Sequence, residues 1–127
     1  MLYPFKFQPI LKDKIWGGQK LQKILKKPTT SAEAGESWEI SDVQGDTSIV
    51  SNGTMAGTSL KSLMELHTTE LLGHKNFQQF GTKFPLLIKF IDAKLALSVQ
   101  LHPNDALAKS RHNSFGKTEM WYVVQAD

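Results

Sequence analysis

The second half of the chain carries the clearest pattern of apolar and polar positions. Residues 85–93 form a nearly continuous apolar run of strand length, and residues 95–101 alternate strictly between apolar and polar side chains. Residues 117–124 are rich in β-branched and aromatic side chains, which favour strands. Several short strands separated by turn residues are typical of an all-β sandwich or barrel. The pattern therefore predicts a mainly β fold.

The first half mixes short strands with short helices. Thr58 or Ser59 can cap a helix whose apolar positions are Leu60, Leu63, Met64 and His67. Gly17-Gly18 is expected to break the chain. The other expected elements are an extended edge segment at 3–9, a helix over about 19–26, strands at 37–42 and 47–50, a further helix over about 69–80, and a short helix from Pro103-Asn104-Asp105 to about Lys109.

Composition narrows the class of protein. The 127 residues indicate one domain at most, and the absence of cysteine excludes disulfides and thiolate ligands. Arg111 is the single arginine among 15 basic residues, which disfavours nucleic-acid binding. The sequence shows neither a signal peptide nor an apolar stretch of the roughly 20 residues that cross a bilayer. We therefore expect a cytoplasmic protein with no membrane or nucleic-acid partner.

A polar face in an apolar region suggests a metal site. In residues 95–101 the apolar positions point to one side, while Ser98, Gln100 and, if the strand continues, His102 point to the other. Gln100 and His102 would lie roughly 7 Å apart on that face, close enough to converge on one ion.

Glu119 adds a carboxylate to this picture. It shares a face with Lys117 and Trp121 in an apolar, aromatic strand, where a buried carboxylate needs a partner or a metal. Histidine, carboxylate and amide donors suit zinc or another divalent first-row metal. A polar pair that binds no ion remains an equally good interpretation of the pattern alone.

Longer motifs resemble a known family. They are FPLLIKFIDAKLALSVQLHPND at 84–105, GKTEMWYVV at 116–124, KIWGG at 14–18 and GESWEIS at 35–41. Together, and in this order, they resemble the short bacterial form of the type I, cupin-fold, zinc-dependent mannose-6-phosphate isomerases. The resemblance implies a cupin-like antiparallel jelly roll, here incomplete, with short appended α-helices. It also implies interconversion of mannose 6-phosphate and fructose 6-phosphate through a zinc-stabilised cis-enediolate.

The resemblance assigns roles to six residues. It implies that one Zn²⁺ per chain is held by Gln100, His102 and Glu119, that Lys117 and Lys89 are catalytic, and that Ser98 lies near the substrate phosphate. Two of these have plain alternatives, because Lys89 could protect an edge strand and Ser98 could be a small inward residue. Trp38 and Glu39 match a motif near the family's site.

The sequence departs from the family in two ways. Longer members carry a histidine where this chain has Gly116. Residues 1–127 are also expected to be only the N-terminal part of a cupin domain, without the late histidine ligand and the phosphate anchors, so that this stretch alone is expected to be inactive. Exposed strand edges at 85–101 and 117–124 then predict a homo-oligomer. The alternatives are a non-catalytic sugar-phosphate-binding module and a structural all-β fragment.

Overall fold

The computed structural model describes residues 1–126. The chain forms two compact units, Met1–Ala96 and the part that begins at Leu97, and each is described here by itself. The fold is mainly antiparallel sheet with a few short helices, which confirms the predicted fold class. In the described part of the chain, no helix is long and apolar enough to span a membrane.

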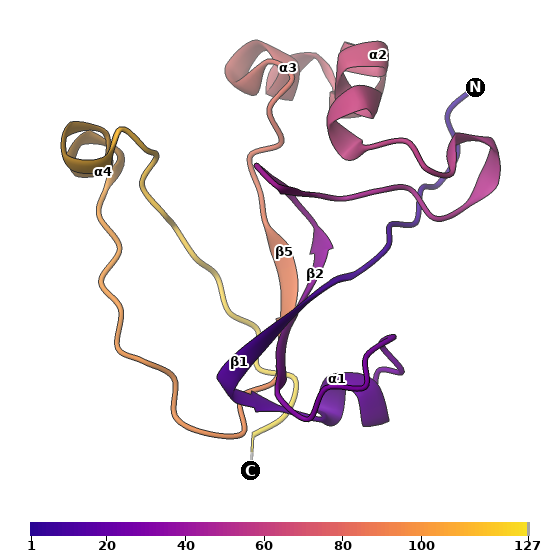
Figure 1. Cartoon of the computed structure of the whole chain (residues 1–127). Helices are drawn as coiled ribbons and strands as arrows, with labels where there is room; N and C mark the ends of the chain where they lie inside the picture. Colours follow the sequence, from indigo (N-terminus) through magenta and orange to yellow (C-terminus); the bar gives the residue numbers. More distant parts are fainter. Residues whose placement is uncertain (127) are drawn as a thin grey trace. The chain divides into compact units, whose positions relative to one another are not determined.

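The first unit is built on a three-stranded antiparallel sheet (Figure 1). Its strands are β1 (Ile10–Gly18), β2 (Ala34–Ile40) and β5 (Ile88–Ile91), in the order β1-β2-β5. β2 is the central strand, with Lys12 of β1 opposite Glu36 and Lys89 of β5 opposite Trp38. A small hairpin follows, formed by β3 (Asp42–Val43) and β4 (Asp46–Thr47).

The N-terminal strand differs from the prediction. The regular strand starts at Ile10, after the predicted segment 3–9, and it runs through the two glycines that were expected to break the chain. A Cβ atom on Gly17 would lie 2.2 Å from the carbonyl oxygen of Glu33, so only glycine allows this close approach of backbones. The glycines therefore mark a tight strand contact with shifted register.

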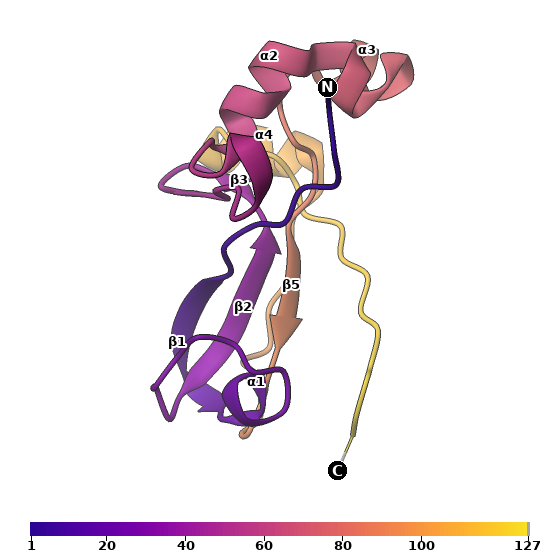
Figure 2. The same ribbon diagram turned by 90° about the vertical axis from the view of Figure 1, so that its right-hand side faces the viewer.

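Helices lie at both ends of the sheet. Figure 2 shows α1 (Lys20–Lys23) at one end and α2 (Leu60–Leu72) with α3 (His74–Phe80) at the other. A 3₁₀ turn, η1 (Gly53–Met55), precedes α2. The Ser59 side chain accepts a hydrogen bond from Ser62 N at 3.1 Å, as the predicted cap requires. Leu63 and Met64 are fully buried, so the predicted apolar face of α2 is the helical part of the core.

The second unit contains one helix, α4 (Asp105–His112). The predicted strands at 95–101 and 117–124 are wrong, because residues 97–104 and 113–126 have no strand pairing among the described residues. Alternation fixes which side chains share a face, but a strand also needs a neighbouring backbone to complete its hydrogen bonds. Of the apolar run at 85–93, residues 88–91 find such a partner in β2.

Candidate metal and catalytic site

Three of the predicted site residues meet in the second unit. His102 Nε2 lies 2.9 Å from Glu119 Oε1. Lys117 forms an ion pair with the same carboxylate oxygen, and its Nζ is 3.5 Å from His102 Nε2. Trp121 Nε1 donates a hydrogen bond of 2.8 Å to Glu119 Oε2. We call these four residues the His102 cluster.

Local sequence spacing places three of the four residues of this cluster. Lys117, Glu119 and Trp121 follow one another at every second position, so an extended backbone turns all three to the same side. His102 comes from the other extended segment of the unit, before α4. Lys117, Glu119 and Trp121 thus share one side of the chain, as predicted for a strand, although their segment has no regular strand pairing.

The cluster keeps the Glu119 carboxylate ionised. The hydrogen bond from Lys117, and then that from Trp121, lower the pKa of Glu119 to about 2 from its ordinary value of 4.5. An ionised carboxylate accepts hydrogen bonds and binds cations, whereas a protonated one does so poorly. The side chains of His102 and Glu119 are 29% and 28% exposed, and Glu119 as a whole residue lies on the surface. An imidazole nitrogen and an ionised carboxylate therefore lie side by side in the His102 cluster, within reach of solvent.

Gln100 and Ser98 form a separate contact. Gln100 Nε2 donates a hydrogen bond of 3.2 Å to Ser98 Oγ, and both side chains are exposed. The structure therefore brings two of the three predicted metal ligands together and directs the third to its neighbour. The searched part, residues 1–126, holds no group of three His, Asp or Glu side chains with metal-binding geometry.

Lys89, the other predicted catalytic residue, lies in the first unit and has a buried partner. Its Nζ donates a hydrogen bond of 2.8 Å to Glu36 Oε1. Trp38 Nε1 donates another, also of 2.8 Å, to Glu36 Oε2, and Lys14 Nζ lies 3.9 Å from that oxygen. Glu36 is only 7% exposed. The lysine is thus held by a buried carboxylate, although β5 is an edge strand.

Two opposing effects act on Glu36. Burial raises the pKa of its carboxyl group, but the hydrogen bonds from Lys89 and Trp38, with the charges of Lys89 and Lys14, outweigh burial and bring the pKa below 4.5. Sequence reasoning missed Glu36 and selected its neighbours. The alternation of residues 34–40 was the available signal, because it places Glu36 and Trp38 on one face of the strand.

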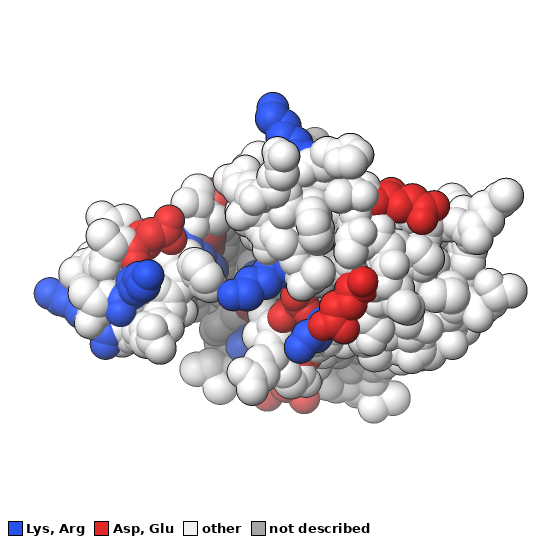
Figure 3. All heavy atoms as spheres, turned by 90° about the horizontal axis from the view of Figure 1, so that it is seen from above, with Lys and Arg blue, Asp and Glu red and all other residues white. Residues whose placement is uncertain are grey.

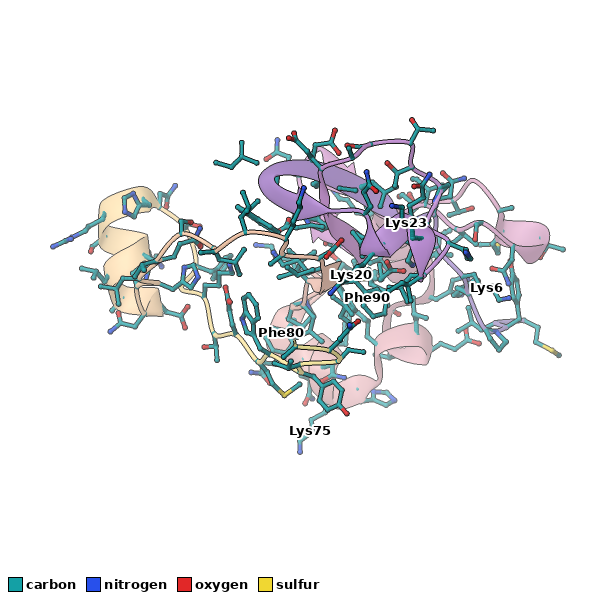
Figure 4. All side chains as sticks on the ribbon, turned by 90° about the horizontal axis from the view of Figure 1, so that it is seen from below. Lys6, Lys20, Lys23, Lys75, Phe80 and Phe90 are labelled. Atoms are coloured by element: carbon teal, nitrogen blue, oxygen red, sulfur yellow. The ribbon has the colours of Figure 1, made fainter. Side chains whose placement is uncertain are left out.

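Glu39 faces the opposite side of β2. Its Oε1 accepts a hydrogen bond of 2.6 Å from the buried Ser37 hydroxyl, and its Oε2 accepts one of 2.7 Å from Lys27 Nζ. Lys27 also stands 5.3 Å from the ring centre of Phe90, which lies on the α1 side of the sheet (Figure 4). These contacts join the segment after α1 to the sheet. In this unit Glu39 is a structural anchor, on the face away from Lys89.

The surface charges are mixed. On the face shown in Figure 3, acidic and basic side chains are interspersed. The lysines that cluster in the sequence around 20–27 include two that lie on α1, Lys20 and Lys23 (Figure 4). This arrangement fits a solvated helix face of the kind expected from the sequence.

Comparison with known proteins places these residues in a family. The model of the phosphomannose isomerase type I catalytic domain matches residues 4–121. The mannose-6-phosphate isomerase of Streptococcus mutans is 40% identical over 100% of this chain and 39% of its own length, and the mannose-6-phosphate isomerase ManA of Bacillus subtilis is 41% identical over 95% and 37%. The crystal structure of the mannose 6-phosphate isomerase from Bacillus subtilis matches 91% of this chain and 35% of its own, with a TM-score of 0.79 and 34% identity. This chain therefore spans less than two fifths of these relatives, and it belongs to the type I phosphomannose isomerase family.

Proposed function

We propose that this chain supplies part of the active site of an isomerase that interconverts mannose 6-phosphate and fructose 6-phosphate. The observation that supports this function best is the convergence of His102, Lys117 and Glu119, 15 and 17 positions apart, in a chain whose motifs match the family. A cation ligand pair beside a lysine is suited to a reaction that builds negative charge on a sugar oxygen.

The donor set fits a metal ion, and the family is generally metal-dependent. His102 and Glu119 offer one nitrogen and one ionised oxygen side by side, which is the chemistry that zinc prefers in an N/O site. Gln100 is the third ligand of the proposal, through its amide oxygen. A bound zinc ion would act as a Lewis acid that stabilises negative charge on the substrate.

The protein's own side chains would do the rest. Lys117 orients Glu119 and adds a second positive charge next to His102. Lys89 carries a proton on Nζ that it shares with the buried Glu36, so this pair can hold or move a proton at that atom. Ser98 Oγ accepts from Gln100, which leaves its own hydroxyl proton to donate to a phosphate oxygen. The proposed substrate is accordingly a phosphorylated sugar.

The test combines metal content with turnover in the intact protein. Fructose 6-phosphate formation from mannose 6-phosphate is followed in a coupled assay with zinc in excess, beside zinc affinity measured by calorimetry. His102→Ala should remove both zinc binding and turnover, whereas Lys117→Ala should lower turnover more than zinc affinity. Tight sugar-phosphate binding without turnover would instead establish a non-catalytic binding module. Zinc affinity unchanged in His102→Ala would reject the proposed ligand.

A further inference from the structure

The two proposed ligands of the His102 cluster, His102 and Glu119, lie on either side of α4 in the sequence. The segments before and after this helix are hydrogen bonded to each other. Lys117 N donates a hydrogen bond of 3.3 Å to Pro103 O, and Gly116 N donates one of 2.9 Å to Asp105 Oδ1. We call Pro103–Asp105 together with Gly116–Lys117 the clasp.

Gly116 fits the clasp because it has no side chain. A Cβ atom at this position would lie 2.6 Å from both Asn104 C and Asp105 N and 2.8 Å from Pro103 O. These neighbours are backbone atoms, so one side of the clasp would have to move. Gly116 does not have a positive φ, which means that alanine would be acceptable in conformation and would fail only on space.

The helix between the two sides has defined ends. Asn104 Oδ1 accepts a hydrogen bond of 3.0 Å from Leu107 N at the start of α4. At the other end Asn113 adopts the left-handed conformation, and its N–H contacts the carbonyl groups of Ala108 and Lys109. Helix α4 is therefore a spacer of fixed length that returns the chain to the clasp.

The clasp sets the distance between the two ligands. His102 directly precedes Pro103, and Glu119 follows Lys117 by two residues on an extended backbone. With Pro103 and Lys117 hydrogen bonded, these side chains meet at 2.9 Å. We propose that Asp105 and Gly116 are positioning residues, which hold His102 and Glu119 ready for a shared metal ion. This inference rests on the proposed metal site.

A preformed pair binds an ion more tightly than a mobile pair, because the ordering of the chain has been completed before binding. Without the clasp, His102 and Glu119 would sit on two extended segments that no ladder connects among the described residues. Partners that orient metal ligands commonly contribute about 10–100-fold to metal affinity. Loss of either clasp residue should have an effect of that size.

The experiment measures Co²⁺ affinity by visible absorbance and Zn²⁺ affinity by competition, using the chain and five variants. Asp105→Ala and Gly116→Ala are expected to weaken binding about 10–100-fold. Lys109→Ala is the matched control: it changes an exposed side chain of the same helix and leaves both clasp hydrogen bonds in place, so its affinity should stay within about threefold. His102→Ala defines loss of the ligand itself.

The outcomes separate the two proposals. If His102→Ala binds Co²⁺ as well as the unmodified chain, the metal site itself is rejected. If His102→Ala loses binding while Asp105→Ala and Gly116→Ala keep it, the metal site stands and the positioning role is overturned. Asp105→Asn keeps an acceptor oxygen for Gly116 N and should bind more tightly than Asp105→Ala. Should Asp105→Ala lose its helical circular dichroism, Gly116→Ala decides, and affinity equal to that of Lys109→Ala would then count against the clasp.

Discussion

Trp121 donates its indole hydrogen to Glu119 Oε2 at 2.8 Å and thereby leaves Glu119 Oε1 facing His102. The same arrangement occurs in the other unit, where Trp38 donates to Glu36 Oε2 and leaves Oε1 to Lys89. In both cases the tryptophan follows the glutamate by two residues, and a lysine binds the second oxygen. Each tryptophan therefore fixes the orientation of a carboxylate that serves a predicted site residue.

Replacing Trp121 by phenylalanine should weaken metal binding. The substitution keeps an aromatic ring but removes the hydrogen bond that orients Glu119, and such partners typically contribute about 10–100-fold to affinity. Calorimetric titration with Zn²⁺ measures the change. Tyr122→Phe, one position along in the same segment, is the control and should bind as the unmodified chain does. Equal affinities for the two variants would remove Trp121 from the site.

Replacing Lys117 by methionine should raise the pKa of Glu119. The hydrogen bond from Lys117 is the largest cause of its low value of about 2, so the pKa should move up toward 4.5. At pH 3 a larger fraction of this carboxyl group would then be protonated in the variant than in the unmodified chain. Carboxyl ¹³C NMR titration without metal follows this group. Lys109→Met on α4 should leave the titration unchanged, and no shift in Lys117→Met would contradict the ion pair.

Glu36 should make the first unit sensitive to acid. Its pKa in the folded state lies below 4.5, so the ionised carboxylate stabilises the fold above about pH 4.5, and this contribution disappears as the pH falls through the lower folded-state value. Glu36→Gln should lower the free energy of unfolding at pH 7 by about 1.5–3 kcal/mol, the range for hydrogen bonds to charged groups. It should also flatten the fall in stability at acid pH.

Urea denaturation between pH 3 and pH 7 tests this prediction. The exposed Glu65→Gln serves as the control, because its side chain lies on the outer face of α2. The prediction for Glu36 is wrong if the two variants show the same slope of stability against pH.

Ser59 should contribute to stability mainly through its cap, beside a contact of 2.9 Å between its hydroxyl and that of Ser62. Its hydroxyl accepts from Ser62 N, so Ser59→Ala leaves a backbone donor of α2 without this partner and should lower the free energy of unfolding by about 1 kcal/mol. Thermal denaturation followed by circular dichroism measures the loss. Lys61→Ala, exposed in the first turn, should change stability far less, and an equal effect would show that helix propensity, not the cap, is responsible.

The sequence predicted best what local chemistry decides. Ser59 caps the helix that follows it, α4 begins at Asp105 within the expected opening at 103–105, and the mainly β class follows from short apolar runs. The sequence predicted poorly the strands, because a strand depends on pairing with another segment of backbone. Residues 95–101 and 117–124 alternate as strands do, yet alternation carries no information about which backbone completes the hydrogen bonds.

The candidate site shows the same difference between features set by local spacing and features that depend on distant partners. The every-second-residue spacing of Lys117 and Glu119 was enough to place them on one side, and His102 joins them. Glu36 and Asp105 were missed because their partners, Lys89 and Gly116, lie 53 and 11 positions away in the chain. The ligand and catalytic roles of the six residues remain predictions, which the experiments above address.

The sequence separation of these contacts also bears on how the chain folds. The clasp closes a loop over 11 positions, whereas the Lys89–Glu36 contact that joins β5 to β2 closes one over 53. Contacts of low sequence separation form early, since little chain entropy is lost before they are made, and non-local strand pairing is slower. We therefore expect α4 and its clasp to form in microseconds, on the timescale of a helix or a hairpin, and the addition of β5 to the sheet to set the rate of folding.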